Sequence, residues 1–98
     1  MTITKETNGT ELKVAVAGRL DTTTAPELES ELKASMDGIE HLVLDFKDLE
    51  YISSAGLRVL LSTQKIMNTQ GKMTVSSVND VVMEIFEVTG FSEILNIV

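Results

Sequence analysis

Ninety-eight residues are enough for one small domain with a single hydrophobic core, and a hydrophobic content of 43% is typical of a folded chain. The formal net charge of −7, from 15 acidic and 8 basic residues, makes nucleic acids and anionic membranes unfavourable partners, because both repel an acidic surface. The absence of Cys excludes disulfides, thiolate metal ligands and cysteine nucleophiles.

The sequence opens without a basic leader followed by an apolar stretch, and none of its apolar runs reaches the length needed to cross a membrane. We therefore expect a cytoplasmic protein. No repeat, low-complexity tract or linker divides the chain, so we expect a single domain over residues 1–98. The basic residues form no cluster, and a protein is a more natural partner than nucleic acid.

A β-hairpin is expected at the N-terminus. Residues 2–6 alternate weakly between apolar and polar side chains and predict a short edge strand. Asn8-Gly9 is a strong hairpin signal, because both residues tolerate a positive φ. The second strand should have one apolar face, formed by Leu12, Val14 and Val16.

The helix that follows has recognisable start and stop signals. Thr24 and Glu27 have the spacing of a capping box, and Pro26 falls in the first turn, where its missing N–H costs little. Asp37-Gly38 is expected to end the helix. Its narrow apolar stripe would consist of Leu28, Leu32 and Met36.

The centre of the chain combines a buried strand, a polar loop, a serine pair and a second helix. Residues 41–46 form a compact apolar run of strand length, and apolar residues recur at helical spacing from about Ser54 to Thr69. Most of the circumference of that helix is apolar, so neighbours as well as the sheet should flank it. One narrow polar sector remains to face water, and it consists of Ser54, Arg58, Ser62, Lys65 and Thr69.

Ser53 and Ser54 lie at the start of this helix, where four backbone N–H groups have no partner inside the helix. A serine there commonly caps the helix by accepting one of these hydrogen bonds, and by pattern alone Ser54 fits that role. An added phosphate would meet the same free donors and the positive end of the helix dipole. The position therefore fits either a structural cap or a phosphorylation site.

The last quarter of the chain predicts one more strand, over residues 73–76, and one more helix. Asn79 can cap this helix, Gly90 can end it, and residues 91–98 add an apolar turn or a short strand. Alternating strands and helices after a hairpin predict an α/β fold with a mixed sheet and helices packed mainly on one side. The inner face of the last helix should consist of Val81, Val82, Ile85 and Phe86.

Enzymatic interpretations have little support. His41 is the only histidine and lies at the opposite end of its strand from Ser54, roughly 15 Å away, which disfavours a Ser-His-acid triad. The serine segment lacks the glycine spacing and the lysine of a Walker-type phosphate loop. Asp21, Asp45 and Asp48 all fall at strand ends or in loops on one rim, where they could gather around Mg²⁺ or simply cap loops. We expect no enzymatic activity, no cofactor and no resident metal.

Three segments of the chain match a known family pattern. They are Gly18-Arg19-Leu20-Asp21 followed by Thr24-Ala25, then Leu42-Val43-Leu44-Asp45, then Tyr51-Ile52-Ser53-Ser54-Ala55-Gly56-Leu57. With the order of strands and helices, the chain resembles the STAS domain family, named for sulfate transporters and anti-sigma factor antagonists, over essentially its whole length. The resemblance implies the STAS fold, a small mixed sheet of four or five strands with about four helices.

In the anti-sigma factor antagonist branch of that family, an anti-sigma factor binds the unmodified STAS protein and releases its sigma factor. The anti-sigma factor is often also a kinase that phosphorylates a serine at this helix start, and a serine phosphatase is its implied counterpart. Carried over by motif position, the acceptor is Ser54. The family frequently has Asp at the preceding position, whereas this chain has Ser53, which leaves a second hydroxyl as an alternative acceptor.

The polar sector and the resemblance together imply one partner-binding surface, which comprises Asp21, Thr22, Ser53, Ser54, Arg58, Ser62 and Lys65. Two other functions stay open. The chain fits a STAS interaction module for a transporter subunit, a histidine-kinase-like protein or a sensory assembly. It also fits, less well, a small hydrolase or nucleotide-binding enzyme that uses Asp21, Asp45 and the serines. The sequence names neither the anti-sigma factor nor the sigma factor.

Overall fold

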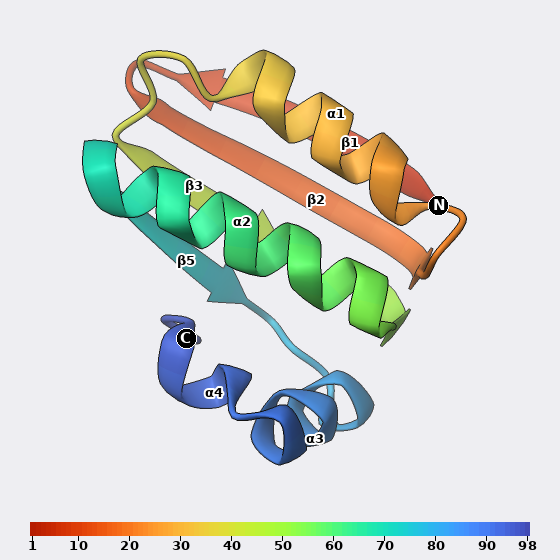
Figure 1. Cartoon of the computed structure of the whole chain (residues 1–98). Helices are drawn as coiled ribbons and strands as arrows, with labels where there is room; N and C mark the ends of the chain where they lie inside the picture. The colour runs from red at the N-terminus through yellow and green to blue at the C-terminus, as the bar shows by residue number, and fades with distance from the viewer.

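The computed structural model describes all 98 residues and contains a five-stranded sheet and four helices. Strands and helices alternate after an initial hairpin, as the hydrophobic pattern predicts (Figure 1). The elements are β1 (Thr2–Asn8), β2 (Glu11–Leu20), α1 (Ala25–Ser35), β3 (His41–Asp45), β4 (Leu49–Ile52), α2 (Ser54–Gln70), β5 (Lys72–Ser76), α3 (Asp80–Thr89) and α4 (Phe91–Ile94).

The sheet is built on β2, its longest strand. β1 pairs antiparallel with β2 across the predicted Asn8-Gly9 turn, while β3 pairs in parallel with the first half of β2 and β5 lies beyond β3. The second half of β2 pairs in parallel with β4 from Gly18 onward, and the register of this pairing shifts between Gly18 and Arg19. The predicted mixed sheet is therefore confirmed, with five strands.

β4 lies where the sequence predicts a polar loop, so that expectation is wrong. Leu49 and Ile52 are buried in β4, while Glu50 is exposed. The pairing with β2 is reinforced by Arg19, whose guanidinium carbon lies 4.5 Å from the centre of the Tyr51 ring. A strand of four residues is too short for its periodicity to separate it from a loop.

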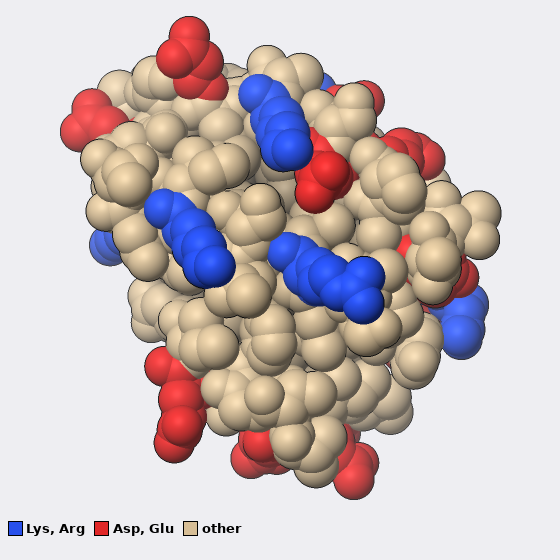
Figure 2. All heavy atoms as spheres, viewed as in Figure 1, with Lys and Arg blue, Asp and Glu red and all other residues tan.

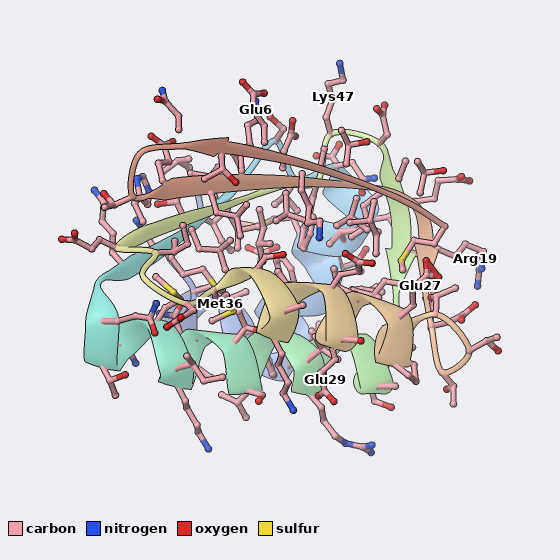
Figure 3. All side chains as sticks on the ribbon, turned by 90° about the horizontal axis from the view of Figure 1, so that it is seen from above. Glu6, Arg19, Glu27, Glu29, Met36 and Lys47 are labelled. Carbon is pink, nitrogen blue, oxygen red and sulfur yellow. The ribbon has the colours of Figure 1, made fainter.

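The helices α1 and α2 cover one face of the sheet (Figure 1). In Figure 3 both helices lie on one side of the sheet, and the labelled side chains of Glu6 and Lys47 point away from them. This arrangement confirms helices packed mainly on one side. The core lies between the two layers and contains every apolar residue predicted for β2 and α1, namely Leu12, Val14, Val16, Leu28, Leu32 and Met36.

The start of α1 differs from the predicted capping box. The Thr24 hydroxyl donates to the carbonyl oxygen of Arg19 (2.8 Å) and accepts from the N–H of Asp21 (2.9 Å), so it does not cap the helix. The Asp21 carboxylate accepts instead from the N–H groups of Thr23 (3.0 Å) and Thr24 (3.1 Å). Pro26 lies in the first turn of α1, as predicted.

The predicted signals at both ends of α3 are confirmed. The Asn79 side-chain oxygen accepts from the N–H of Val82 (2.9 Å), which caps the helix. The amide of the same side chain donates to the carbonyl oxygen of Leu49 in β4 (2.6 Å). Gly90 ends α3 with a φ of 81°, a conformation that suits glycine. Asn79 therefore both starts α3 and ties it to β4.

The inner face of α3 is narrower than the sequence predicts. Val82 and Phe86 are fully buried and Ile85 is half-buried, but Val81 is 56% exposed, so its placement on the inner face is wrong. The last residues form both of the predicted alternatives, the short helix α4 and a single β-bridge from Ile97 to β5.

Two glutamines of α2, the buried Gln64 and the half-buried Gln70, differ in how their side-chain amides are satisfied. The Gln64 amide nitrogen donates to Asn68 Oδ1 (2.9 Å), but its Oε1 is buried without a hydrogen-bond partner. The Gln70 nitrogen donates to the carbonyl oxygens of Met36 (2.7 Å) and Ile39 (2.6 Å), which joins the end of α2 to the segment between α1 and β3. Only the second arrangement should stabilise the fold.

We expect Gln64→Leu to raise the free energy of unfolding by about 1 kcal/mol, because it removes a buried acceptor that has no hydrogen-bond partner within the protein. The matched variant Gln70→Leu should lower the free energy of unfolding by roughly 1–3 kcal/mol, because it leaves two carbonyl oxygens without their donor. Urea denaturation of both variants measures the difference. A Gln64→Leu variant that loses as much stability as Gln70→Leu would contradict this account.

Candidate functional site

The N-terminus of α2 places the two serines in different environments. Ser53 is the N-cap residue, and its Oγ accepts from the N–H of Gly56 at 3.4 Å. Its backbone N–H donates to the carbonyl oxygen of Leu20 at the end of β2 (2.8 Å), and its carbonyl oxygen accepts from the N–H of Leu57 (2.9 Å). Ser53 is half-buried and held by all three groups. The cap is thus one residue earlier than the sequence pattern predicts.

Ser54 is the first residue of α2 and is exposed. Its side chain takes part in no hydrogen bond within the chain, because the capping role belongs to Ser53. This exposed residue therefore lies at the positive end of the helix dipole, and its hydroxyl contributes nothing to the hydrogen bonding of the fold. A group added to this oxygen would displace no internal contact.

Gly56 allows the start of α2 to lie close against the sheet. A Cβ on this residue would come within 2.7 Å of Cγ1 of Ile52 and 2.8 Å of Cγ of Leu20, both of which are buried. Those two residues end β4 and β2, respectively. The missing side chain thus sets how closely the serines are held to the rim of the sheet.

Asp21, which the sequence places in the partner-binding surface, has a structural role in this geometry. Its carboxylate is occupied by the turn between β2 and α1. The backbone N–H of Thr24 is the largest cause that holds the pKa of Asp21 below its ordinary value, helped by the N–H of Thr23 and by Arg19. Asp21 therefore stays ionised as the anchor of a turn that presents Thr22, which is exposed.

A hollow between the first turns of α1 and α2 brings two of the predicted residues together. Thr22, in the turn before α1, and Arg58, on α2, both line it. The sequence analysis missed the contribution of α1 to this surface. The residues that α1 contributes include Pro26 and Glu29, which lie off the apolar stripe of that helix. Their position off the stripe was the only sign in the sequence that they face outward. The full lining is Thr22, Ala25, Pro26, Glu29, Ala55, Arg58 and Val59.

The polar sector of α2 is confirmed as its outer surface in most positions. Arg58 and Lys65 are exposed, whereas Ser62 is half-buried. Ser62 and Lys65 lie farther along α2 and do not line the hollow. The structure thus brings Thr22, Ser54 and Arg58 to the start of the helix and leaves the other two along its length.

The outer face of α2 is basic although the chain is acidic overall. α2 contains no Asp or Glu, and the three salt bridges of the chain use Lys5, Lys13 and Lys33, which leaves Arg58 and Lys65 unpaired. Figure 2 shows three basic side chains on the helix-covered face, one of them directly beside an acidic side chain, and further acidic side chains toward the margins. An acidic partner surface would find there two cations that form no salt bridge within the chain.

The residues considered for enzymatic chemistry do not come together. His41 is half-buried in β3, and its Nε2 lies 3.0 Å from the Thr74 hydroxyl on β5. Asp45 accepts from the N–H of Lys47 (3.0 Å) and, with Asp48, borders a hollow to which Asp21 does not contribute. No three His, Cys, Asp or Glu side chains form a group that could hold a metal ion. Of the two alternatives for Asp21, Asp45 and Asp48, the gathering of all three around one ion is therefore not formed.

None of the helices has both the length and the apolar character required to span a bilayer.

The chain is similar to curated proteins over most of its length. It is 40% identical over 85 residues to the candidate anti-sigma factor antagonist BtrV of Bordetella bronchiseptica, a match that covers 85% of this chain and 73% of that protein. It is 31% identical over 87 residues to the anti-sigma-B factor antagonist of Staphylococcus aureus, covering 87% of this chain and 81% of that one.

Solved structures have the same fold. The crystal structure of an anti-sigma factor antagonist from Mycobacterium paratuberculosis matches 98% of this chain and 83% of its own, with a TM-score of 0.88 and 26% identity. The Bacillus cell fate determinant SpoIIAA, solved in its phosphorylated form, matches 99% of this chain and 91% of its own, with a TM-score of 0.77 and 12% identity. The STAS domain model matches residues 2–98. The chain therefore belongs to the STAS domain family, and its curated relatives bear the name of anti-sigma factor antagonists.

Proposed function

We propose that this protein is an anti-sigma factor antagonist that is controlled by phosphorylation of Ser54. Its unmodified form binds an anti-sigma factor that is also a serine kinase and so releases a sigma factor. Phosphorylation of Ser54 ends the binding, and a serine phosphatase restores it. The observation that carries the proposal is the exposed Ser54 hydroxyl at the start of α2, which no hydrogen bond engages. Membership of the STAS family and the names of the curated relatives support it.

A phosphate on Ser54 is compatible with the folded domain. It would add about −1.5 to −2 charges and three acceptor oxygens at pH 7. At the first residue of α2 these charges face the positive end of the helix dipole, and each such interaction contributes roughly 0.3–1 kcal/mol when exposed. No internal contact of Ser54 has to break. The modification should therefore leave the fold intact and act on the complex.

The complex, by contrast, is sensitive to the same phosphate. A partner that fits a neutral hydroxyl would have to remove water from a dianion, and an uncompensated charge in a desolvated contact costs several kcal/mol. A tenfold loss of affinity requires only about 1.4 kcal/mol. One phosphate is therefore sufficient to switch the complex off.

Ser53 is the weaker candidate for the acceptor. Its Oγ is engaged with the N–H of Gly56 and its side chain is half-buried, so a kinase would have to open the cap to reach it. Ser54 needs no such opening. The proposed contact surface extends from Ser54 and Thr22 along α2 to Arg58, Ser62 and Lys65. Asp21 supports it from beneath by holding the turn that carries Thr22.

The two serines should differ when each is changed to Ala. Ser53→Ala should lower the free energy of unfolding by about 1 kcal/mol, because it removes the cap of α2. Ser54→Ala should change the free energy of unfolding by less than about 0.5 kcal/mol, because the side chain makes no internal contact. Urea denaturation tests both, and equal losses would show that the hydroxyl of Ser54 is not free.

Phosphorylation of Ser54 should abolish partner binding. The cognate anti-sigma factor can be identified by affinity capture from the source cells, with mass spectrometry of Ser53 and Ser54, and titrated calorimetrically. The phosphoprotein and Ser54→Asp should both bind it at least tenfold more weakly. Ser30→Asp, at an exposed serine of α1, is the control and should bind normally. Unchanged affinity of the phosphoprotein and of Ser54→Asp would refute the switch.

Arg58→Glu should weaken the same complex at least tenfold without changing the melting temperature appreciably, because Arg58 is exposed and forms no salt bridge. Lys47→Glu makes the same charge change on the opposite side of the sheet and should leave affinity within about twofold (Figure 3). A large fall in the melting temperature of Arg58→Glu would make this residue structural. Equal effects of the two variants would indicate a general charge effect.

A further inference from the structure

The large apolar side chains that the fold leaves exposed are confined to the end of the chain. They are Val81, Val88, Ile94 and Val98, and none belongs to β1–β5, α1 or α2. Single exposed apolar residues are ordinary, but several within the last eighteen residues indicate a surface that another molecule covers.

Two of these residues form a ridge on α3. Val81 and Val88 are 56% and 77% exposed and lie seven residues apart, with the half-buried Ile85 between them. This i, i+4, i+7 spacing places the three side chains along one side of the helix. Val82 and Phe86 already anchor the inner side of α3 in the core. The ridge is therefore apolar surface that the fold does not use.

The charge around the ridge is of one sign. No Lys, Arg or His occurs after Lys72, whereas α3 carries Asp80, Glu84 and Glu87, all exposed and none in a salt bridge. Glu84 lies three residues after Val81 and four before Val88, beside the ridge. Figure 2 shows acidic side chains along the lower edge of the molecule, in the region where Figure 1 places α3.

We propose that the α3 ridge, comprising Val81, Ile85 and Val88 with the acidic residues Asp80, Glu84 and Glu87, docks into a groove of a partner protein that is apolar at its centre and lined by Lys and Arg at its rim. The apolar ridge supplies buried area, and the acidic border selects the sign of the partner's charge. The contact is separate from the proposed Ser54 surface, because it uses none of the residues of α1 or α2.

Two other occupants fit the ridge less well. A membrane surface rich in anionic lipid would repel the three carboxylates. The basic face of a second copy supplies Arg58 and Lys65, but none of the large apolar side chains on α1 or α2 is exposed to meet the ridge. A partner with both a basic rim and an apolar groove satisfies both halves of the surface.

The test uses a synthetic peptide of about 14 residues, roughly four helical turns, with Leu along one side and Lys beside it. Titrated into the full, isotope-labelled chain, it should shift the amide resonances of residues 80–88. Val81→Ser/Val88→Ser and Glu84→Lys/Glu87→Lys should each weaken the peptide at least tenfold. Val98→Ser, at a valine that is 72% exposed outside the ridge, should bind as the native chain does.

Several results would overturn the proposal. They are unchanged affinity of either double variant, resonance shifts confined to α1 and α2, and equal binding of a peptide with Glu in place of Lys. Two observations would also replace the proposed partner: concentration-dependent dimerisation that Val81→Ser/Val88→Ser abolishes, and binding to phosphatidylserine vesicles that the same variant abolishes. None of these outcomes touches the Ser54 switch, because Arg58→Glu tests that surface on its own.

Discussion

The position of the serine pair depends on how closely the first turn of α2 approaches the ends of β2 and β4. At Gly56 there is no room for even one methyl group between the helix and the side chains of Leu20 and Ile52. The backbone of Ser53 is fixed in the same place by its hydrogen bond to Leu20. Ser53 is held by these contacts, and its own hydroxyl accepts the capping hydrogen bond. The next residue, Ser54, therefore lies on the surface with a hydroxyl that forms no hydrogen bond within the chain.

In this arrangement, the residues of α2 that form the core are different from those that are exposed for binding. On α2, the inner residues Leu57, Leu60 and Met67 are buried in the core, while Arg58 and Lys65 on the outer side make no ion pair. The charge of the chain is divided in the same way. α2 contains no acidic residue, and the chain after Lys72 contains no basic one. The net charge of −7 therefore does not describe the outer face of α2, which is basic. A partner interacts with the local charge of the surface it contacts and not with the net charge of the whole chain.

Long periodic segments could be predicted from the sequence, because many residues of each segment repeat the same hydrophobic pattern. The alternation in β2 and the extent of α2 belong to this class. The caps of α3 were also predictable, because Asn79 acts through its side-chain oxygen and Gly90 through the positive φ that glycine tolerates. Two local features could not be predicted. β4 has only four residues, and its strand character comes from pairing with the far end of β2. Thr24 has the spacing of a helix cap, but its hydroxyl donates a hydrogen bond to the carbonyl oxygen of Arg19 instead.

At the candidate site, the sequence predicted that the two serines lie at the start of a helix, but not which of them caps it. Which of two adjacent serines caps a helix depends on where the last strand residue leaves the backbone, and that is a tertiary property. The same reason separates Asp21 from Asp45 and Asp48. All three follow or end strands, yet Asp21 follows the half of β2 that continues past β3, so it lies away from the other two. The contribution of α1 to the hollow could not be predicted from the sequence for a related reason. The starts of α1 and α2 come together only through the packing of the two helices.

The side chain of Asn79 links the start of α3 to the strand that leads to the serine pair. Its oxygen holds the first turn of α3 and its nitrogen holds the main chain of Leu49, so a single rigid group is clamped to both. Leu49 begins the four-residue strand that leads directly into Ser53. The first turn of α3 is therefore joined through one side-chain amide to the strand that leads into the serine pair, although the two segments lie thirty residues apart in the chain.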